Sequence, residues 1–280
     1  PLNVSRSFLQ NDGYVQKLSA HITKKVADKL TSLYETEREN YNKYWDDINP
    51  FVKFGCIREQ KFYDRVKDII IFKTTNGDYV TLKDYLDRNK EKHRNKVFCV
   101  TDERQQAQYI KLFKEQNMEA VLLTTVIDTH FVQFLEMKES GVKFLRVDAD
   151  LSENLKDTGN TEDEAIVKEK TEVIEKLFRE AIGDEKLKIK VENLKTTSTP
   201  GMILLSEESR RLQDMGRIFG RTDMDNLFPK DETLVLNSGN SLIKAILKLK
   251  EKEDKKEDVL LICRHIYDLA MMRTDNLIQI

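Results

Sequence analysis

The apolar residues of this chain change their spacing near residue 96, and this change restricts the possible folds most. Before it they recur every three or four residues, as one helical stripe: Val15, Leu18, Ile22, Val26, Leu30 and Leu33. We expect residues 1–95 to form a mainly helical domain. A second helix is predicted to stop before Asn49-Pro50, because proline disfavours the helical conformation in the preceding residue.

Three short apolar runs follow, over residues 97–101, 120–123 and 143–147, and helical patterns separate them. Strand–helix–strand–helix–strand with short connections is typical of a parallel α/β unit. We therefore expect a small three-stranded parallel unit over residues 96–160. It contains neither GxGxxG nor GxxxxGK[ST], the glycine-rich loops that bind phosphate groups.

Residues 161–280 predict a third, C-terminal domain. Apolar and charged residues alternate strictly over 186–192, which indicates a half-buried strand, and Pro200-Gly201 is predicted to turn it back into 202–205 as a hairpin. The segment Val259–Met272 is apolar nearly all round, so its helix must be buried by its own domain or by a second subunit. The predicted fold class is α+β and multidomain: a helical segment, the parallel α/β unit, then a hairpin or small sheet with helices.

Charge and composition exclude several classes of function. The 47 basic and 49 acidic residues nearly cancel, which leaves no strongly basic field for nucleic acid. No apolar stretch is long enough to span a bilayer. The three cysteines form no CxxC pair and the four histidines show no ligand spacing, so we expect no metal site. Because the chain opens at Pro1 without an initiator methionine, we expect it to be a piece of a longer protein.

Two patterns can carry chemistry. Ser5 precedes the first helical stripe as an N-cap would, and Arg6 and Gln10 are one helical turn apart. A guanidinium and an amide at a helix N-terminus can bind phosphate, although both residues are also ordinary surface residues.

The second pattern is the predicted helix Ser209–Gly220. Leu212, Met215 and Phe219 follow one another at three- and four-residue spacing, with four arginines beside them. Such a face can hold exposed apolar segments of other proteins, or it can be an ordinary core stripe.

The segment Pro1–Gln10 closely resembles the PLNxSR…LQ catalytic-loop segment of the 90-kDa heat-shock chaperone family, bacterial HtpG type. Val100–Arg104, Ile127–Phe131 and Val259–Asp268 also fall in the order of that family. The resemblance spans essentially the whole sequence. It implies the later part of a middle domain and most of a C-terminal domain of a cytoplasmic stress-response chaperone.

The resemblance also implies roles for individual residues. Arg6 and Gln10 match the pair that approaches the γ-phosphate of ATP, whose Mg and pocket belong to a separate N-terminal domain, so no cofactor is expected on this chain alone. Leu212, Met215 and Phe219 match a helix that contacts non-native client proteins. The full-length family dimerises through the predicted helix that carries these residues: Leu260, Ile262, Ile266 and Leu269.

The family follows that helix with another one, whereas this sequence ends at Ile280 without a second helical pattern. We therefore expect a homodimer at full length and weak association or a monomer for this chain. The alternative is a non-enzymatic adaptor or scaffold whose helices and α/β unit only bind other proteins. A self-contained enzyme is disfavoured because the sequence shows no nucleophile–base pair, metal cluster or phosphate loop.

Overall fold

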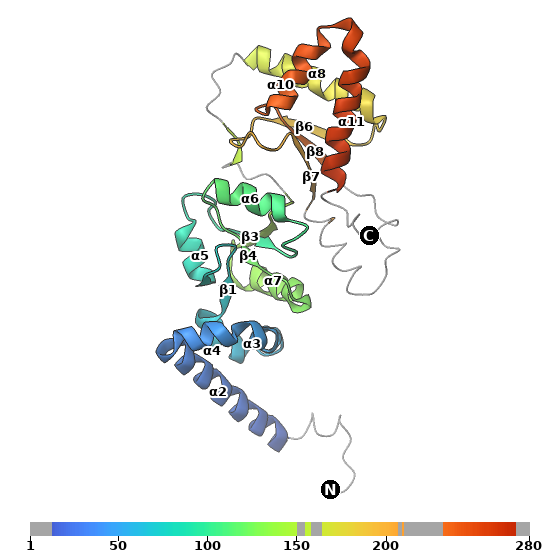
Figure 1. The fold of residues 1–280 in the computed structure, drawn as a ribbon. Coiled ribbons are helices and arrows are strands. Elements are labelled where there is room, and N and C mark those ends of the chain that lie inside the picture. The colour runs from blue at the N-terminus through green and yellow to red at the C-terminus, as the bar shows by residue number, and fades with distance from the viewer. Residues whose placement is uncertain (1–12, 150–154, 158–163, 207–208, 210–231, 273–280) are drawn as a thin grey trace. The chain divides into compact units, whose positions relative to one another are not determined.

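A computed structural model describes residues 13–149, 155–157, 164–206, 209 and 232–272 (Figure 1). The chain divides into two compact units, one of residues 1–88 and 125–142 and the other of residues 89–124 and 143–280. Across the described ranges, no helix combines the length and the hydropathy that crossing a bilayer requires. The predicted α+β class is confirmed.

The first unit is mainly helical, as its apolar spacing predicts. Its helices are α2 (Gly13–Thr36), α3 (Arg38–Arg58), α4 (Gln60–Val66), the 3-10 turn η1 (Lys67–Ile69), α5 (Leu82–Arg88) and α7 (Val126–Lys138). Two short strands, β1 (Ile71–Lys73) and β2 (Tyr79–Thr81), pair antiparallel. The turn between them includes Gly77, whose φ of +91° suits glycine.

Helix α3 continues through Pro50, so the prediction that it stops before Asn49-Pro50 is wrong. Proline has no N–H to donate to the carbonyl of Asp46, four residues earlier. The side chain of Asn49 supplies the missing donor: its Nδ2 donates to the carbonyl of Asp46 at 3.1 Å and to that of Trp45 at 3.0 Å. Because a local side-chain bond replaces the lost backbone bond, the helix tolerates the proline.

Helix α2 is confirmed, but only its C-terminal half joins a core. Ala27 is its single buried residue, while Leu18, Ile22 and Val26 remain 47%, 53% and 46% exposed. Within the first unit, the N-terminal half of α2 extends past α3 and α4 (Figure 1). The apolar stripe therefore continues beyond the elements that could bury it.

The second unit contains the predicted parallel sheet. Strands β3 (Lys96–Val100), β4 (Val121–Leu122) and β5 (Lys143–Arg146) lie in the order β4-β3-β5, and both pairings are parallel. Helix α6 (Ala107–Glu115) connects β3 to β4. Its Tyr109 hydroxyl donates to the carbonyl of Ile203, which ties this helix to the next sheet.

The next sheet is mixed, and the predicted hairpin is not formed. Strands β6 (Lys188–Glu192) and β7 (Gly201–Leu205) do not pair with each other, because β8 (Glu232–Asn237) lies between them, parallel to β6 and antiparallel to β7. The Asn237 side chain accepts from Leu194 N at 3.1 Å and donates to the carbonyls of Thr196 and Thr199 at 2.7 and 3.0 Å. These bonds hold the connection that would otherwise be the hairpin turn.

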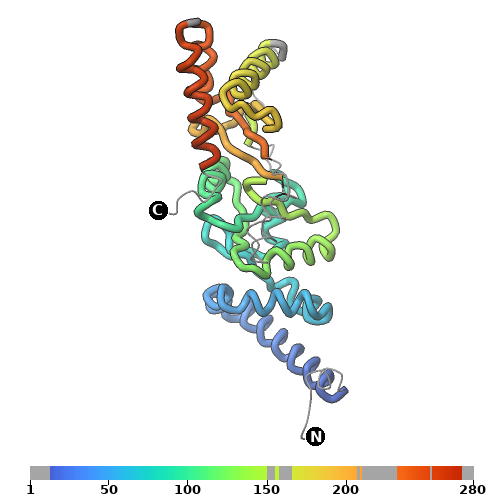
Figure 2. Tube along the Cα trace, turned by 90° about the vertical axis from the view of Figure 1, so that its right-hand side faces the viewer, coloured from blue at the N-terminus to red at the C-terminus, as the bar shows by residue number. Residues whose placement is uncertain are grey.

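Strands β7 and β8 of this mixed sheet are buried on both faces, whereas β6 exposes Lys188 and Lys190 on one face. Met202, Leu204 and Val235 contribute to one apolar cluster together with residues of β3 and α6. Ile203, Leu234 and Leu236 contribute to a second cluster with three helices, α8 (Glu164–Ile182), α10 (Ser241–Lys250) and α11 (Lys256–Met272). Helices α8 and α11 run side by side (Figure 2). Alternate residues of one strand thus serve two cores.

Candidate functional site

Two of the three groups of predicted site residues fall outside the described part of the chain. Arg6 and Gln10 belong to residues 1–12, and Leu212, Met215 and Phe219 belong to residues 210–231. Their assignments remain predictions.

Helix α11, the third predicted site, is firmly attached to the second unit. Four of its residues are buried at helical spacing, Val259, Cys263, Ile266 and Ala270. This stripe packs against α8, β7 and α10. Glu257 and Asp258 lie in its first turn, where their negative charges interact favourably with the positive end of the helix dipole.

The four predicted dimerisation residues differ in how far they are exposed. Ile266 is only 2% exposed and belongs to the core, while Leu260 and Ile262 are half-buried. Leu269 is 54% exposed. Of these four side chains, Leu269 is therefore the one largely exposed to solvent, and the other three are at least partly buried.

Sequence reasoning missed two exposed partners of Leu269. Leu261 is 58% exposed and Met272 is 59% exposed, and both lie at helical spacing from Leu269. The spacing of the buried stripe could have indicated them, since residues opposite a core stripe face away from it. Together Leu261, Leu269 and Met272 form what we call the α11 apolar face.

The first unit carries further exposed apolar side chains. On α2 they are Tyr14, Leu18, Ile22 and Val26, spaced four residues apart, which we call the α2 apolar stripe. On α3, Phe51 is 78% exposed and Phe54 is 51% exposed. Such surface suits contact with other proteins when it is contiguous. The sequence indicated the α2 stripe but assigned it no function.

A buried ion pair between Lys53 and Asp128 joins α3 to α7. The Lys53 ammonium lies 2.5 Å from Oδ1 of Asp128, and both side chains are about 5% exposed or less. The other carboxylate oxygen, Oδ2, accepts from Thr125 N at 2.9 Å and from Thr125 Oγ1 at 2.8 Å, which caps α7. The rings of Phe72 and Phe131 lie about 6 Å from the ammonium. This ion pair therefore links two helices of the first unit.

The three cysteines and His93 lie in buried surroundings. All three cysteines are buried, and burial raises the pKa of the Cys56 and Cys263 thiols to about 12, which keeps them protonated and unreactive. Burial also lowers the pKa of His93. Within the described ranges, no three His, Cys, Asp or Glu residues are grouped closely enough to hold a metal ion.

Known proteins match this chain over most of its length. The family model described as "Hsp90 protein" matches residues 1–279. Chaperone protein htpG of Bacteroides fragilis strain YCH46 is 31% identical over 261 residues, covering 90% of this chain and 38% of the relative. Chaperone protein HtpG of Porphyromonas gingivalis strain ATCC 33277 is 32% identical over 256 residues, covering 88% and 37%. That of Idiomarina loihiensis is 29% identical over 227 residues, covering 76% and 34%.

These matches define the class of protein: the chain belongs to the Hsp90 family. The relatives from Bacteroides fragilis and Porphyromonas gingivalis are both named as HtpG chaperones. The family resemblance predicted from residues 1–10 is therefore confirmed. The chain spans less than two fifths of the length of these relatives.

Proposed function

We propose that this chain is the client-holding and dimerising part of an ATP-dependent cytoplasmic chaperone. The observation that carries the proposal is the family match over residues 1–279, together with relatives named as chaperones. The exposed apolar residues of the first unit and of α11 support it, since a protein that holds non-native chains needs apolar surface in contact with water.

The proposed role of Arg6 is to neutralise charge on the γ-phosphate of ATP. In phosphoryl transfer, charge spreads over the oxygens of the transferred group, and a positioned guanidinium stabilises that charge. Gln10 adds an amide donor one helical turn further on. A separate N-terminal domain would hold the nucleotide and Mg, so this chain would supply only these two groups.

The proposed client contacts are Leu212, Met215 and Phe219, supported by the α2 apolar stripe. Leucine, methionine and aromatic side chains adapt to many apolar partners. The stripe adds such residues on a helix that has only Ala27 buried. Non-native proteins expose apolar segments, which these residues would cover.

The proposed dimer contact is the α11 apolar face. In a symmetric dimer the same patch meets itself, so a helix face that repeats Leu, Leu and Met is self-complementary. Val259, Cys263, Ile266 and Ala270 hold the helix from behind. Leu260, Ile262 and Ile266 therefore contribute to the interface by fixing the helix.

The test of the ATPase role joins this chain to the N-terminal nucleotide domain of the full-length protein. Arg6→Ala should lower ATP turnover on the order of 100-fold, the usual loss for one stabilising donor. Arg94→Ala is the matched control, because Arg94 is exposed in the second unit. Unchanged turnover in the Arg6 variant would contradict the assignment and favour the adaptor alternative.

The dimer contact is tested by sedimentation of the chain over a concentration series. The native chain should move toward a dimer as concentration rises, and Leu269→Lys should raise the dissociation constant by about 10-fold or more. Leu242→Lys is the control, since Leu242 is 40% exposed on α10. Equal behaviour of the two variants would exclude the α11 apolar face as the interface.

A further inference from the structure

A pocket of about 490 Å³ opens in the second unit, between α8, the end of α10 and the start of α11. Its floor is apolar: Val259 and Leu177 are buried and Val173 is half-buried. Four lysines surround it, namely Lys176, Lys250, Lys252 and Lys256. Pockets of this size hold small organic ligands.

The rim has more positive than negative charge. Among the described residues that line the pocket, Glu180 is the single acidic one, and it pairs with Lys256 at 2.8 Å. In the described part of the chain, Lys176, Lys250 and Lys252 have no ion pair. Lysines that line one pocket repel one another, although salt screens the repulsion between exposed charges beyond about 8 Å. An anion in the pocket would relieve this repulsion.

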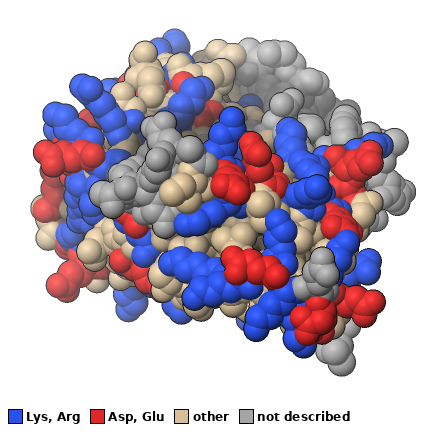
Figure 3. Space-filling model, turned by 90° about the horizontal axis from the view of Figure 1, so that it is seen from above, with Lys and Arg blue, Asp and Glu red and all other residues tan. Residues whose placement is uncertain are grey.

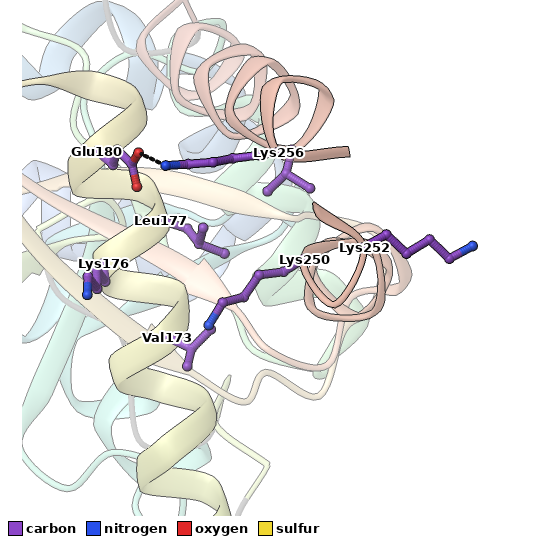
Figure 4. A pocket seen from close by; sticks show the side chains of 8 residues that line it. Val173, Lys176, Leu177, Glu180, Lys250, Lys252 and Lys256 are labelled. Carbon is purple, nitrogen blue, oxygen red and sulfur yellow. Dashed lines mark ion pairs between the residues drawn. The ribbon is translucent and has the colours of Figure 1, made fainter. Parts of the chain in front are cut away.

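The side chains divide the pocket into two ends (Figure 4). The Glu180–Lys256 pair closes one end, while Lys250 extends from α10 toward Val173 at the other, and Lys252 points away. Leu177 lies between them. Lysine stems add apolar surface beneath their charged ends. On the face of the molecule seen in Figure 3, basic and acidic side chains are interspersed.

We propose that this pocket binds a small amphipathic anion, with its apolar body on Val173, Leu177 and Val259 and its carboxylate facing Lys250 and Lys176. Both parts are required: the floor offers no hydrogen-bonding side chain for a purely polar anion, and the exposed lysines give specificity for the charge. None of these residues belongs to the proposed ATPase, client or dimer contacts. The failure of this proposal would therefore leave the proposed function unaffected.

The first test follows backbone amide shifts of the chain by NMR during titration with three probes. Octanoate has both an apolar body and a charge, octanol has the body alone and acetate has the charge alone. Octanoate should bind saturably, with the largest shifts at Val173, Leu177 and Val259. Octanol and acetate should cause no saturable shifts there at equal concentrations. Equal binding of octanol, or no saturable shift with octanoate, would overturn the proposal.

The second test uses two lysines of the same helix. Lys250→Ala should weaken octanoate binding roughly three- to fivefold, the size expected for one exposed charge contact. Lys248→Ala is the matched control, because Lys248 is an exposed residue of α10 that does not line the pocket. Equal losses in both variants would show that only general charge attracts the probe. If an acidic, leucine-containing peptide bound here and octanoate did not, the site would be a peptide site and the proposal would be wrong.

Discussion

The two units differ in the kind of ion pair that they bury and in how much of their apolar surface they expose. The first unit buries an ion pair, Lys53–Asp128, and leaves much of its apolar surface in water, including the α2 apolar stripe. The second unit buries apolar residues on both faces of a mixed sheet, and its buried ion pair, Arg146–Asp148, joins residues only two positions apart. A buried ion pair contributes little net stability but is costly to break. The comparison teaches that the buried ion pair of the first unit connects two helices, whereas that of the second unit is a local contact.

The largest expected effect comes from breaking the ion pair of the first unit. Lys53→Met leaves the Asp128 carboxylate buried without its partner, and the free energy of unfolding of that unit should fall by about 4 kcal/mol. The only tryptophan, Trp45, is 2% exposed on α3, so its fluorescence reports this unit. Denaturant titration followed by that fluorescence measures the change.

The matched control is Lys73→Met in the same unit. Lys73 lies 3.9 Å from Asp46, and both side chains are exposed, so its loss should cost less than about 1 kcal/mol. Equal losses for the two variants would show that the buried pair has no special role and would remove the contrast between the units.

The second largest effect is expected in the apolar core of the second unit. Ile266→Ala leaves a cavity between α11 and its neighbours and should cost about 3 kcal/mol. Loss of helical circular dichroism in denaturant measures it, while the Trp45 transition should keep its midpoint. Leu269→Ala on the exposed face should change stability by less than about 0.5 kcal/mol. A shift in the Trp45 midpoint would show that the two units do not unfold separately.

A smaller effect tests how α3 tolerates its proline. Asn49→Ala leaves the carbonyl of Asp46 without its side-chain donor and should cost about 1.5 kcal/mol in the first unit. Adding Pro50→Ala restores a backbone N–H and should recover part of that loss. The Trp45 transition measures both variants, and no recovery in the double variant would contradict the proposed compensation.

The smallest expected change in stability concerns the α2 apolar stripe. Leu18→Ser together with Ile22→Ser should alter the free energy of unfolding by about 0.5 kcal/mol or less, because both side chains are about half exposed. The same variant should suppress the aggregation of a heat-unfolded client less well than the native chain. A large loss of stability would instead show that the stripe is part of a core.

The sequence predicted the type of most elements but not all of their partners. Local apolar spacing was enough to predict the parallel sheet. The hairpin failed because β8, about 30 residues after β7, competes for both strands, and local sequence carries no information about that choice. The end predicted for α3 was wrong because the Asn49 side chain donates a hydrogen bond to the carbonyl of Asp46, which the proline leaves without a backbone donor.

The candidate site was predictable to a similar extent. The motif at residues 1–10 identified the family, and the apolar run at 259–272 identified α11 as a helix, of which the second unit buries one stripe. In a sequence that is apolar nearly all round, the spacing of apolar residues does not indicate which side of the helix is buried. It therefore could not distinguish Ile266, in the core, from Leu269, on the surface. Only tertiary packing against α8 and β7 decides which residues remain exposed.

The most direct test of the central claim measures light scattering of a heat-unfolded model client, such as malate dehydrogenase, with and without this chain. If the chain holds non-native proteins, scattering should fall as the chain approaches equimolar amounts with the client. Replacing Leu212, Met215 and Phe219 with serine should weaken the effect while the loss of helical circular dichroism in denaturant keeps its midpoint. Scattering equal to that seen with an unrelated folded protein of the same mass would contradict the account.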